Sequence, residues 1–146
     1  MIPLLLLSCG SSGPDPISSG PLGGTIGGRP FTAKSARARK SASKTPNKKA
    51  ISIYDVDTKC SDPTPATDRW VLVTPIWAAG AAQDPYSVAW YVKAATGGTD
   101  TIYIADSSTV EVVDAPAEVG ATGTIRVRAS NKGDAIEGQI TVQVCE

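Results

Sequence analysis

Residues 125–144 read IRVRASNKGDAIEGQITVQV and carry the clearest structural pattern in the chain. Apolar and polar residues alternate from Ile125 to Ser130, and again from Ile136 to Val144. A period of two places successive side chains on opposite faces of a strand, so each strand has one packed face and one solvated face. The residues between them, Asn131-Lys132-Gly133-Asp134, are typical of a turn. We therefore expect two strands joined by a tight turn.

The same period continues upstream, where Gly, Pro, Asn and Asp recur at intervals typical of strand connections. Trp70-Val71-Leu72-Val73 is apolar on both faces and is placed in the interior of a sheet, with Pro75 marking the end of that strand. The paired Gly27-Gly28 indicates a bend that turns Phe31 into the core. The earlier strands are expected at residues 24–28, 30–40, 50–55, 69–76, 86–94, 101–105 and 109–113. The prediction is an all-β fold, a single antiparallel β-sandwich or small barrel of about nine short strands.

The N-terminus carries an apolar run that ends at a cysteine. Leu4-Leu5-Leu6-Leu7-Ser8 precedes Cys9, and Gly10-Ser11-Ser12-Gly13-Pro14 follows it. This arrangement resembles the cleavage and lipidation site of bacterial lipoproteins, which implies cleavage before Cys9 and a diacylglycerol on its thiol. The run is too short to span a bilayer, and it lacks the basic start of a complete export signal. A fragment of an ordinary export signal with an incidental cysteine is the alternative.

Composition divides the chain into three parts. From the resemblance we expect residues 1–8 to be a truncated lipoprotein signal and residues 9–23 to contain the lipidated cysteine and a tether rich in Gly, Ser and Pro. We expect residues 24–146 to form the β-domain. The chain has 146 residues, of which 41% are hydrophobic, and no net formal charge. A domain of this size buries enough surface for an ordinary core without a metal.

The cysteine count supports an oxidising compartment. Three cysteines leave one unpaired unless it is used otherwise. Lipidation of Cys9 leaves Cys60 and Cys145 to form a disulfide that closes a loop of about 85 residues. Two free buried thiols are the alternative. Because Cys145 falls on the polar side of the last strand, we expect the bond at a rim of the sheet or across its twist.

Catalysis finds little support in the sequence. The absence of histidine removes the commonest general base and metal ligand, and with it serine–histidine and cysteine–histidine chemistry. Four aspartates close in sequence could in principle serve glycoside hydrolysis, but aspartate is also an ordinary turn residue. They are Asp55, Asp57, Asp62 and Asp68. A calcium loop starting at Asp55 fails because Lys59 and Cys60 occupy positions of a ligand and a glycine. We expect no enzymatic activity, no metal and no cofactor.

Aromatic residues gather in one part of the chain. They are Trp70, Trp77, Tyr86, Trp90 and Tyr91. Flat rings on a sheet face can stack on sugars, but tryptophans usually serve core packing, which the shared face of Trp70 and Leu72 favours. Trp77 lies in a loop, where an exposed indole would need a reason. Trp77, Tyr86 and Trp90 are the candidate ligand-binding residues.

Basic residues are concentrated between Arg29 and Lys49, where no acidic residue occurs. These residues are solvated surface charges in one interpretation and a contact with anionic lipid headgroups in another. The segment contains a single aromatic residue, Phe31, which argues against nucleic acid as a partner.

Several motifs of the mature chain occur together in one group of proteins. They are Gly24–Phe31 in the form G-x-[IV]-x-G-x-x-F, the pair Ser35-Ala36, the strand Ile51–Asp55 leading to Cys60, and the closing strand Gly138–Cys145. In these motifs the chain resembles small exported lipoprotein domains of environmental, myxobacteria-like bacteria. The resemblance implies an envelope lipoprotein of a family without an assigned function, and it transfers no catalytic residue.

The sequence therefore predicts a lipid-anchored envelope protein with a non-catalytic structural or interaction domain. In the bacterial lipoproteins that the N-terminus resembles, a residue other than Asp after the lipidated cysteine implies sorting to the outer membrane, and Gly10 fits that rule. The expected partners are the membrane, through the lipid on Cys9, and other envelope proteins or polysaccharide. A carbohydrate- or cell-wall-binding lipoprotein that uses exposed tryptophans is the alternative.

Overall fold

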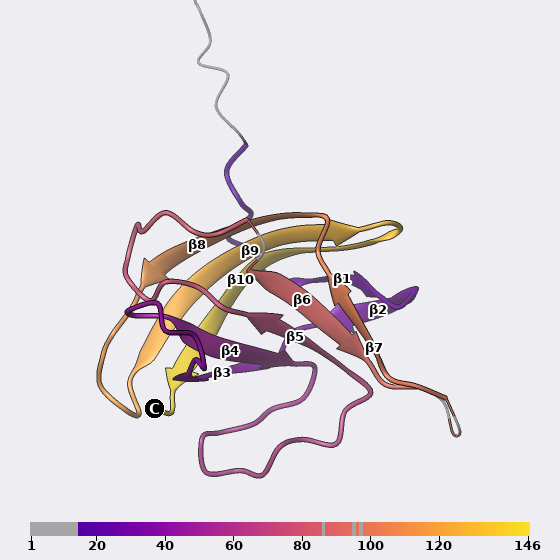
Figure 1. The fold of residues 1–146 in the computed structure, drawn as a ribbon, viewed down its shortest axis with the longest axis horizontal. Helices are drawn as coiled ribbons and strands as arrows, with labels where there is room; N and C mark the ends of the chain where they lie inside the picture. The colour runs from indigo at the N-terminus through magenta and orange to yellow at the C-terminus, as the bar shows by residue number, and fades with distance from the viewer. Residues whose placement is uncertain (1–14, 86, 95, 97) are drawn as a thin grey trace, which may run out of the picture.

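The computed structural model describes residues 15–146 except residues 86, 95 and 97. This part of the chain contains no helix, and therefore none that is long and apolar enough to cross a membrane. Ten strands join in one sheet (Figure 1). They are β1 (Gly23–Ile26), β2 (Arg29–Thr32), β3 (Ser35–Lys40), β4 (Lys49–Tyr54), β5 (Arg69–Val73), β6 (Val88–Val92), β7 (Thr101–Ile104), β8 (Ser107–Asp114), β9 (Thr122–Asn131) and β10 (Asp134–Val144). The predicted all-β class is confirmed.

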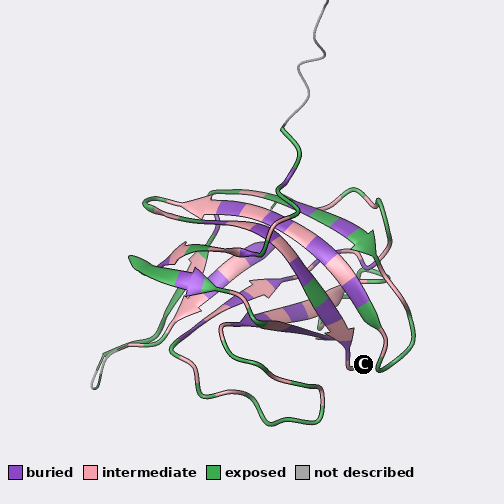
Figure 2. Ribbon diagram, turned by 180° about the vertical axis from the view of Figure 1, so that it is seen from behind, coloured by how far each residue is buried: buried purple, intermediate pink, exposed green. Residues whose placement is uncertain are grey.

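Strands β9 and β10 form the long hairpin that the alternating sequence predicts. They pair antiparallel, and their connection is Lys132-Gly133, in which Lys132 has a φ of 53°. Ile125, Val127 and Ala129 face the core, whereas the residues between them are partly exposed. Figure 2 shows the same alternation of buried and more exposed positions along both strands.

Strand β10 joins the two halves of the sheet. One of its edges pairs with β9, and its other edge pairs first with β1 and then, in parallel, with β3. From β3 the sheet continues through β4, β5 and β6 to β7. The chain then passes through Ala105, whose N–H donates to Val88, and Asp106, whose N–H donates to Ser130, into β8 beside β9. The sheet therefore curls, so that β8–β10 lie across from β3–β7 (Figure 1).

The core fills the space between the two halves of the curled sheet. Its large aromatic side chains include Trp90 and Phe31, which are 0% and 2% exposed. Phe31 reaches the core because Gly27 and Gly28, with φ of 60° and 73°, form the two-residue turn between β1 and β2. Two left-handed residues in a hairpin turn favour glycine, which has no Cβ. The predicted bend at this glycine pair is confirmed.

The expected single strand at residues 30–40 is wrong, because the chain changes partners in its middle. Strand β2 pairs with β1, whereas β3 pairs with β4 and β10. At the break, the Ala33 N–H donates to Leu22 and the Lys34 N–H donates to Tyr54. These two adjacent N–H groups donate to different parts of the sheet, so the chain passes from one part to the other at this point.

A disulfide joins Cys60 to Cys145, with a Cα–Cα distance of 5.3 Å, as predicted. Cys145 follows β10, and its N–H donates to Ala38 of the neighbouring strand. The loop that carries Cys60 lies over the outer face of β3, where the Arg37 guanidinium donates to its Lys59 and Asp62 carbonyls at 3.0 and 2.9 Å. Arg37 is buried beneath this loop. The bond thus fixes both the C-terminus and the loop against one edge of the domain.

Candidate interaction surface

The outer face of β5, β6 and β7 carries apolar side chains where a strand that faces water would carry polar ones. Val71 and Val73 of β5 and Val88 and Trp90 of β6 point into the core and are fully buried. Their neighbours in sequence must then point outward. The outward apolar residues are Trp70, Leu72, Ala89, Tyr91, Ile102 and Ile104. We call these six residues the apolar face.

The register of the strands aligns the apolar face in two rows. Trp70 lies opposite Tyr91, which lies opposite Ile102. The second row is Leu72, Ala89 and Ile104. The rings of Trp70 and Tyr91 stack at 4.6 Å with an angle of 4° between their planes. Direct cross-strand pairs of this kind stabilise a sheet, so the face is a built surface and not a set of scattered residues.

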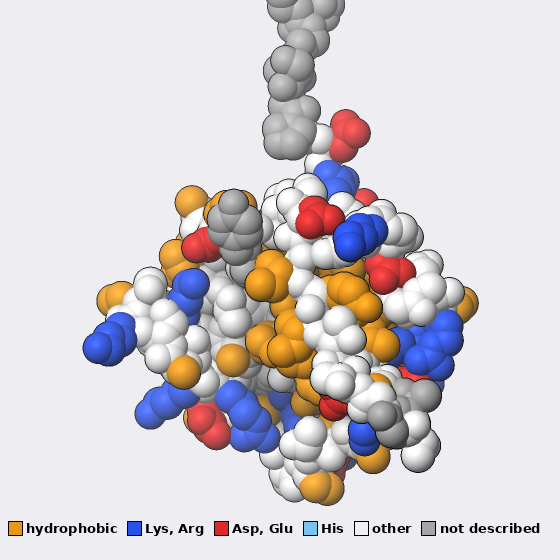
Figure 3. All heavy atoms as spheres, turned by 45° about the vertical axis from the view of Figure 1, so that its right-hand side comes forward, with side chains coloured by type: hydrophobic (Ala, Val, Ile, Leu, Met, Phe, Trp, Pro, Cys, Tyr) orange, Lys and Arg blue, Asp and Glu red, His pale blue; other side chains and the backbone are white. Residues whose placement is uncertain are grey.

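Exposure increases toward the edge of the face. Ile102 and Ile104 are 57% and 59% exposed, whereas the other four residues are partly buried. A hollow of about 220 Å³ lies among Leu72, Tyr91 and the two isoleucines. Figure 3 shows hydrophobic side chains gathered in the middle of this side of the molecule, with charged side chains around them. Contiguous exposed apolar surface framed by polar residues is typical of a binding site.

The sequence prediction for this region is partly confirmed. Strand β5 lies inside the sheet, between β4 and β6, and ends at Val73, before Pro75. The expectation that Trp70 and Leu72 share a core face is wrong, because Val71 and Val73 occupy the core side. A strand that is apolar on both faces gives no sequence signal for which face the core takes.

The predicted ligand-binding tryptophans are both buried. Trp77 is 6% exposed, its indole N–H donates to the Pro116 carbonyl at 2.7 Å, and its ring lies against Gly123. Trp90 is 0% exposed. The expectation of an exposed indole at Trp77 is therefore wrong, and neither side chain offers a ring face to a ligand. Tyr86, the third candidate, lies outside the described residues, as does Cys9.

Two of the four aspartates considered for acid–base chemistry, Asp62 and Asp68, have structural contacts. The Asp62 carboxylate accepts a hydrogen bond from the Lys59 N–H at 2.7 Å. Asp68 pairs with Arg29 at 2.6 Å, and this hydrogen bond is the main cause that lowers the pKa of the Asp68 carboxyl. Within the described part of the chain, no three His, Cys, Asp or Glu side chains gather closely enough to hold a metal ion.

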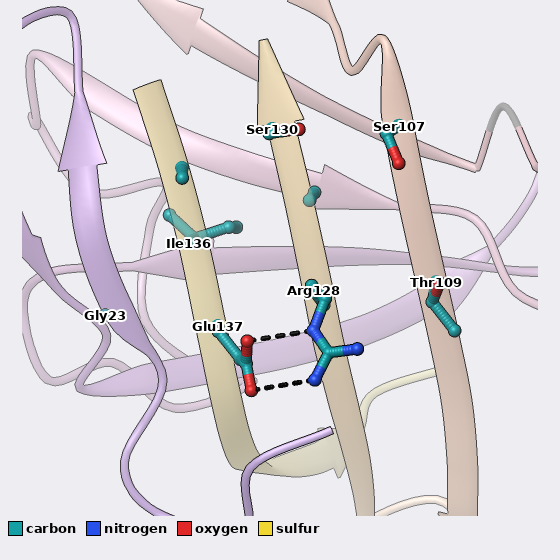
Figure 4. A pocket seen from close by; sticks show the side chains of 9 residues that line it. Gly23, Ser107, Thr109, Arg128, Ser130, Ile136 and Glu137 are labelled. Carbon is teal, nitrogen blue, oxygen red and sulfur yellow. Dashed lines mark hydrogen bonds and ion pairs between the residues drawn. The ribbon is translucent and has the colours of Figure 1, made fainter. Parts of the chain in front are cut away.

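A hollow of about 390 Å³ lies on the outer face of β8–β10 (Figure 4). Its charged groups already bind each other, because Arg128 donates to both carboxylate oxygens of Glu137, at 2.9 and 3.2 Å. Arg128 also donates to the carbonyls of Asp15 and Pro16, and Glu137 accepts from the Ser18 N–H. This ion pair therefore holds the N-terminal segment against the sheet.

The part of the predicted tether that the structure describes is thus bound and not free. Ile17 is 7% exposed and Leu22 is 1% exposed. The Gln139 N–H donates to Gly20 at 2.7 Å, and the Leu22 N–H donates back to Gln139 at 3.1 Å. The expected domain start at residue 24 is therefore too late, because these contacts place residues 15–23 on the domain.

We expect Glu137→Gln to release the segment around Ser18. The Arg128 hydrogen bond, followed by the Ser18 N–H, lowers the pKa of the Glu137 carboxyl, so the ionised form favours the bound segment. This stabilisation is present above the ordinary glutamate pKa and is lost as the pH falls through the lowered value. The Ser18 amide resonance should move toward its unbound position in the variant at neutral pH, and in the natural chain on acidification. The exposed Glu118→Gln is the control; an unmoved Ser18 resonance in Glu137→Gln would contradict the contact.

Several residues of the basic segment also pair within the domain. Arg29 pairs with Asp68, Arg39 pairs with Glu146 at 3.1 Å, and the Lys49 ammonium donates to the Glu146 backbone carbonyl. With Arg37 buried, these contacts favour the interpretation of internal and solvated charges over a lipid-binding stripe.

The apolar face on β5–β7 is a place where the described residues can bury apolar surface against a partner. No family model matches the chain, and no curated protein or solved structure is similar to it.

Proposed function

We propose that this chain is a lipid-anchored envelope protein whose β-domain binds another envelope protein through the apolar face. The observation that carries the proposal is the pair of aligned apolar rows, which end in Ile102 and Ile104, both more than half exposed. Covering each of these side chains would contribute about 1 kcal/mol to binding. Aromatic residues in an apolar patch, here Trp70 and Tyr91, are typical of the residues that dominate binding energy.

The position of the N-terminal segment supports the same role. Arg128 and Glu137 hold residues 15–18 on the outer face of β9 and β10. That half of the curled sheet lies across from β5–β7, so the two outer faces point in opposite directions. A chain anchored through Cys9 would leave the domain on the side opposite the apolar face, which stays open to a partner. The disulfide agrees with an exported protein.

A photo-crosslinking residue in place of Ile104, introduced in cells that carry the natural envelope, tests this proposal. We expect an adduct with a distinct envelope protein, and loss of that adduct when Leu72→Glu places a charge in the face. A photo-crosslinker at exposed Thr141, on the outer face of β10, is the matched control. The same membrane extract gives the intact mass, which should begin at Cys9 and include the acyl groups.

Equal labelling at positions 104 and 141 would refute the role of the apolar face. An unmodified chain that retains Met1 would refute the anchor. These two outcomes are independent, so either half of the proposal can fail alone.

A carbohydrate ligand is the second candidate, on a tryptophan other than those predicted. Trp70 lines a hollow of about 200 Å³ together with Tyr54, Lys93 and Asp100. An aromatic wall with a few polar groups suits a sugar ring. A change in tryptophan fluorescence on titration with cell-wall oligosaccharides, abolished in Trp70→Phe, would favour this candidate over a protein partner.

A further inference from the structure

Strand β7 lies at an end of the sheet, with one edge that is free of strand pairing but bound by the Asn131 side chain at Ile104. Strand β6 pairs with one side of it, and none of the described strands pairs with the other. The Ala105 N–H donates to Val88 of the β6 side. Because backbone groups alternate in direction along an antiparallel strand, Tyr103 also turns its N–H and C=O toward β6, whereas Ile102 and Ile104 turn theirs outward. The Asn131 amide, which donates to the Ile104 carbonyl at 2.7 Å from outside the β6–β7 pair, agrees with this assignment.

The other two edges of the sheet are protected, which makes the β7 edge unusual. Strand β2 carries Arg29 and Pro30, the residue types that discourage strand pairing. The loop that follows β5 covers the edge of β8, where the Gly80 N–H donates to Val112 and Ser108 donates to Pro85. Residues 101–105, by contrast, contain neither a charge nor a proline. Their β-branched and aromatic residues favour an extended partner.

We propose that β7 pairs with β7 of a second copy of this chain, antiparallel and about a two-fold axis at Tyr103. The two outward residues are spaced by two, so this register places Ile102 of each copy opposite Ile104 of the other. The outward N–H groups of both isoleucines and the Ile102 carbonyl then find partners, and the Ile104 carbonyl accepts a second hydrogen bond beside the one from Asn131. A strand edge that pairs with itself in this way gives a closed dimer and not an open fibre.

Charges at the ends of β7 limit the pairing to its centre. Asp100 precedes the strand and Asp106 follows it. In this register, Asp100 of each copy would approach Asp106 of the other. The chain leaves the line of β7 at Asp106, where its N–H donates to Ser130. Pairing over Ile102, Tyr103 and Ile104 is short. The side chains of the two isoleucines supply the remaining contact area.

The pairing would join the apolar faces of two copies into one surface. The row Trp70–Tyr91–Ile102 of one copy would continue into the row Ile104–Ala89–Leu72 of the other. The inference goes beyond the proposed function, because it rests on the strand edge and not on what binds the face.

Sedimentation equilibrium of the full chain with Cys9→Ser, which prevents lipidation, tests the pairing. We expect a monomer–dimer equilibrium at concentrations up to about 1 mM. Ile102→Pro removes an outward N–H without removing a bond to β6, and should weaken dimerisation at least tenfold. Ile102→Val, which keeps the N–H and the apolar side chain, is the matched control. A far-ultraviolet spectrum and melting temperature like those of the parent show that Ile102→Pro remains folded.

A second pair of substitutions tests the register and does not depend on proline. Ile102→Cys with Ile104→Cys should form a covalent dimer on mild oxidation, whereas Thr109→Cys, on β8, should not. A chain that stays monomeric at every concentration overturns the inference and leaves the adduct at position 104 with an envelope protein unaffected. A dimer that persists in both Ile102→Pro and Ile104→Lys overturns it as well, because pairing would then occur elsewhere.

Discussion

Replacing Cys60 and Cys145 together by alanine is expected to lower the free energy of unfolding by about 4 kcal/mol. The disulfide joins residues separated by 85 positions. In the chain-entropy model, a crosslink of this span restricts the unfolded chain by nominally 4–5 kcal/mol, and realised values are often somewhat lower. That is a large fraction of the total stability of a domain of this size, roughly 5–15 kcal/mol. Urea unfolding of the double variant beside the parent measures the difference.

The same substitution should have a local effect. Arg37 is buried beneath the loop at residues 59–62, and its guanidinium donates to Lys59 and Asp62. Once Cys60 is no longer held beside Cys145, this loop should open more often, and amides there should lose protection against hydrogen exchange before those of β9. Cys9→Ser alone is the control, and it should unfold like the parent. A double variant within 1 kcal/mol of the parent would show that the loop is already restricted in the unfolded chain.

The sequence identified the buried side of a strand where the other side is exposed to solvent. In β9 and β10, Arg126 and Glu137 are polar neighbours of Ile125 and Ile136, so alternation alone identifies the buried side. The disulfide was also predictable, because the expected lipidation of Cys9 leaves two cysteines to pair with each other. These features depend on local pattern or on a count.

The features that were missed depend on contacts between distant residues. The parallel pairing of Gln143 with Arg37 has no local signal in either strand. Ile17 and Leu22 are isolated apolar residues in a stretch rich in Gly, Ser and Pro, and only their contacts with the sheet bury them. Trp70 and Trp77 were placed on the wrong sides because a large apolar ring suits both a core and a binding face. Local composition cannot decide between those two environments.

Gly138 is the point at which the N-terminal segment crosses β10. It has a φ of 143°, a backbone conformation that residues other than glycine rarely adopt. A Cβ at this position would lie 2.5 Å from Leu22 Cα and from the Pro21 carbonyl oxygen. These are backbone atoms, fixed on both sides by the hydrogen bonds of Gln139 with Gly20 and Leu22. No rotation of a side chain can relieve such a clash.

We therefore expect Gly138→Ala to lower the free energy of unfolding by at least about 3 kcal/mol, the sum of backbone strain and displacement of residues 20–22. Gly133→Ala is the matched control, because a Cβ there has no atom within 4 Å and its φ lies outside the left-handed region. It should change stability by about 0.5 kcal/mol or less. Thermal and urea unfolding of both variants give the comparison. If Gly138→Ala is no more destabilising than Gly133→Ala, residues 20–22 do not lie against β10 in solution. In that case the chain before β1 is the free tether that its composition predicts, and the ion pair of Arg128 with Glu137 does not hold it.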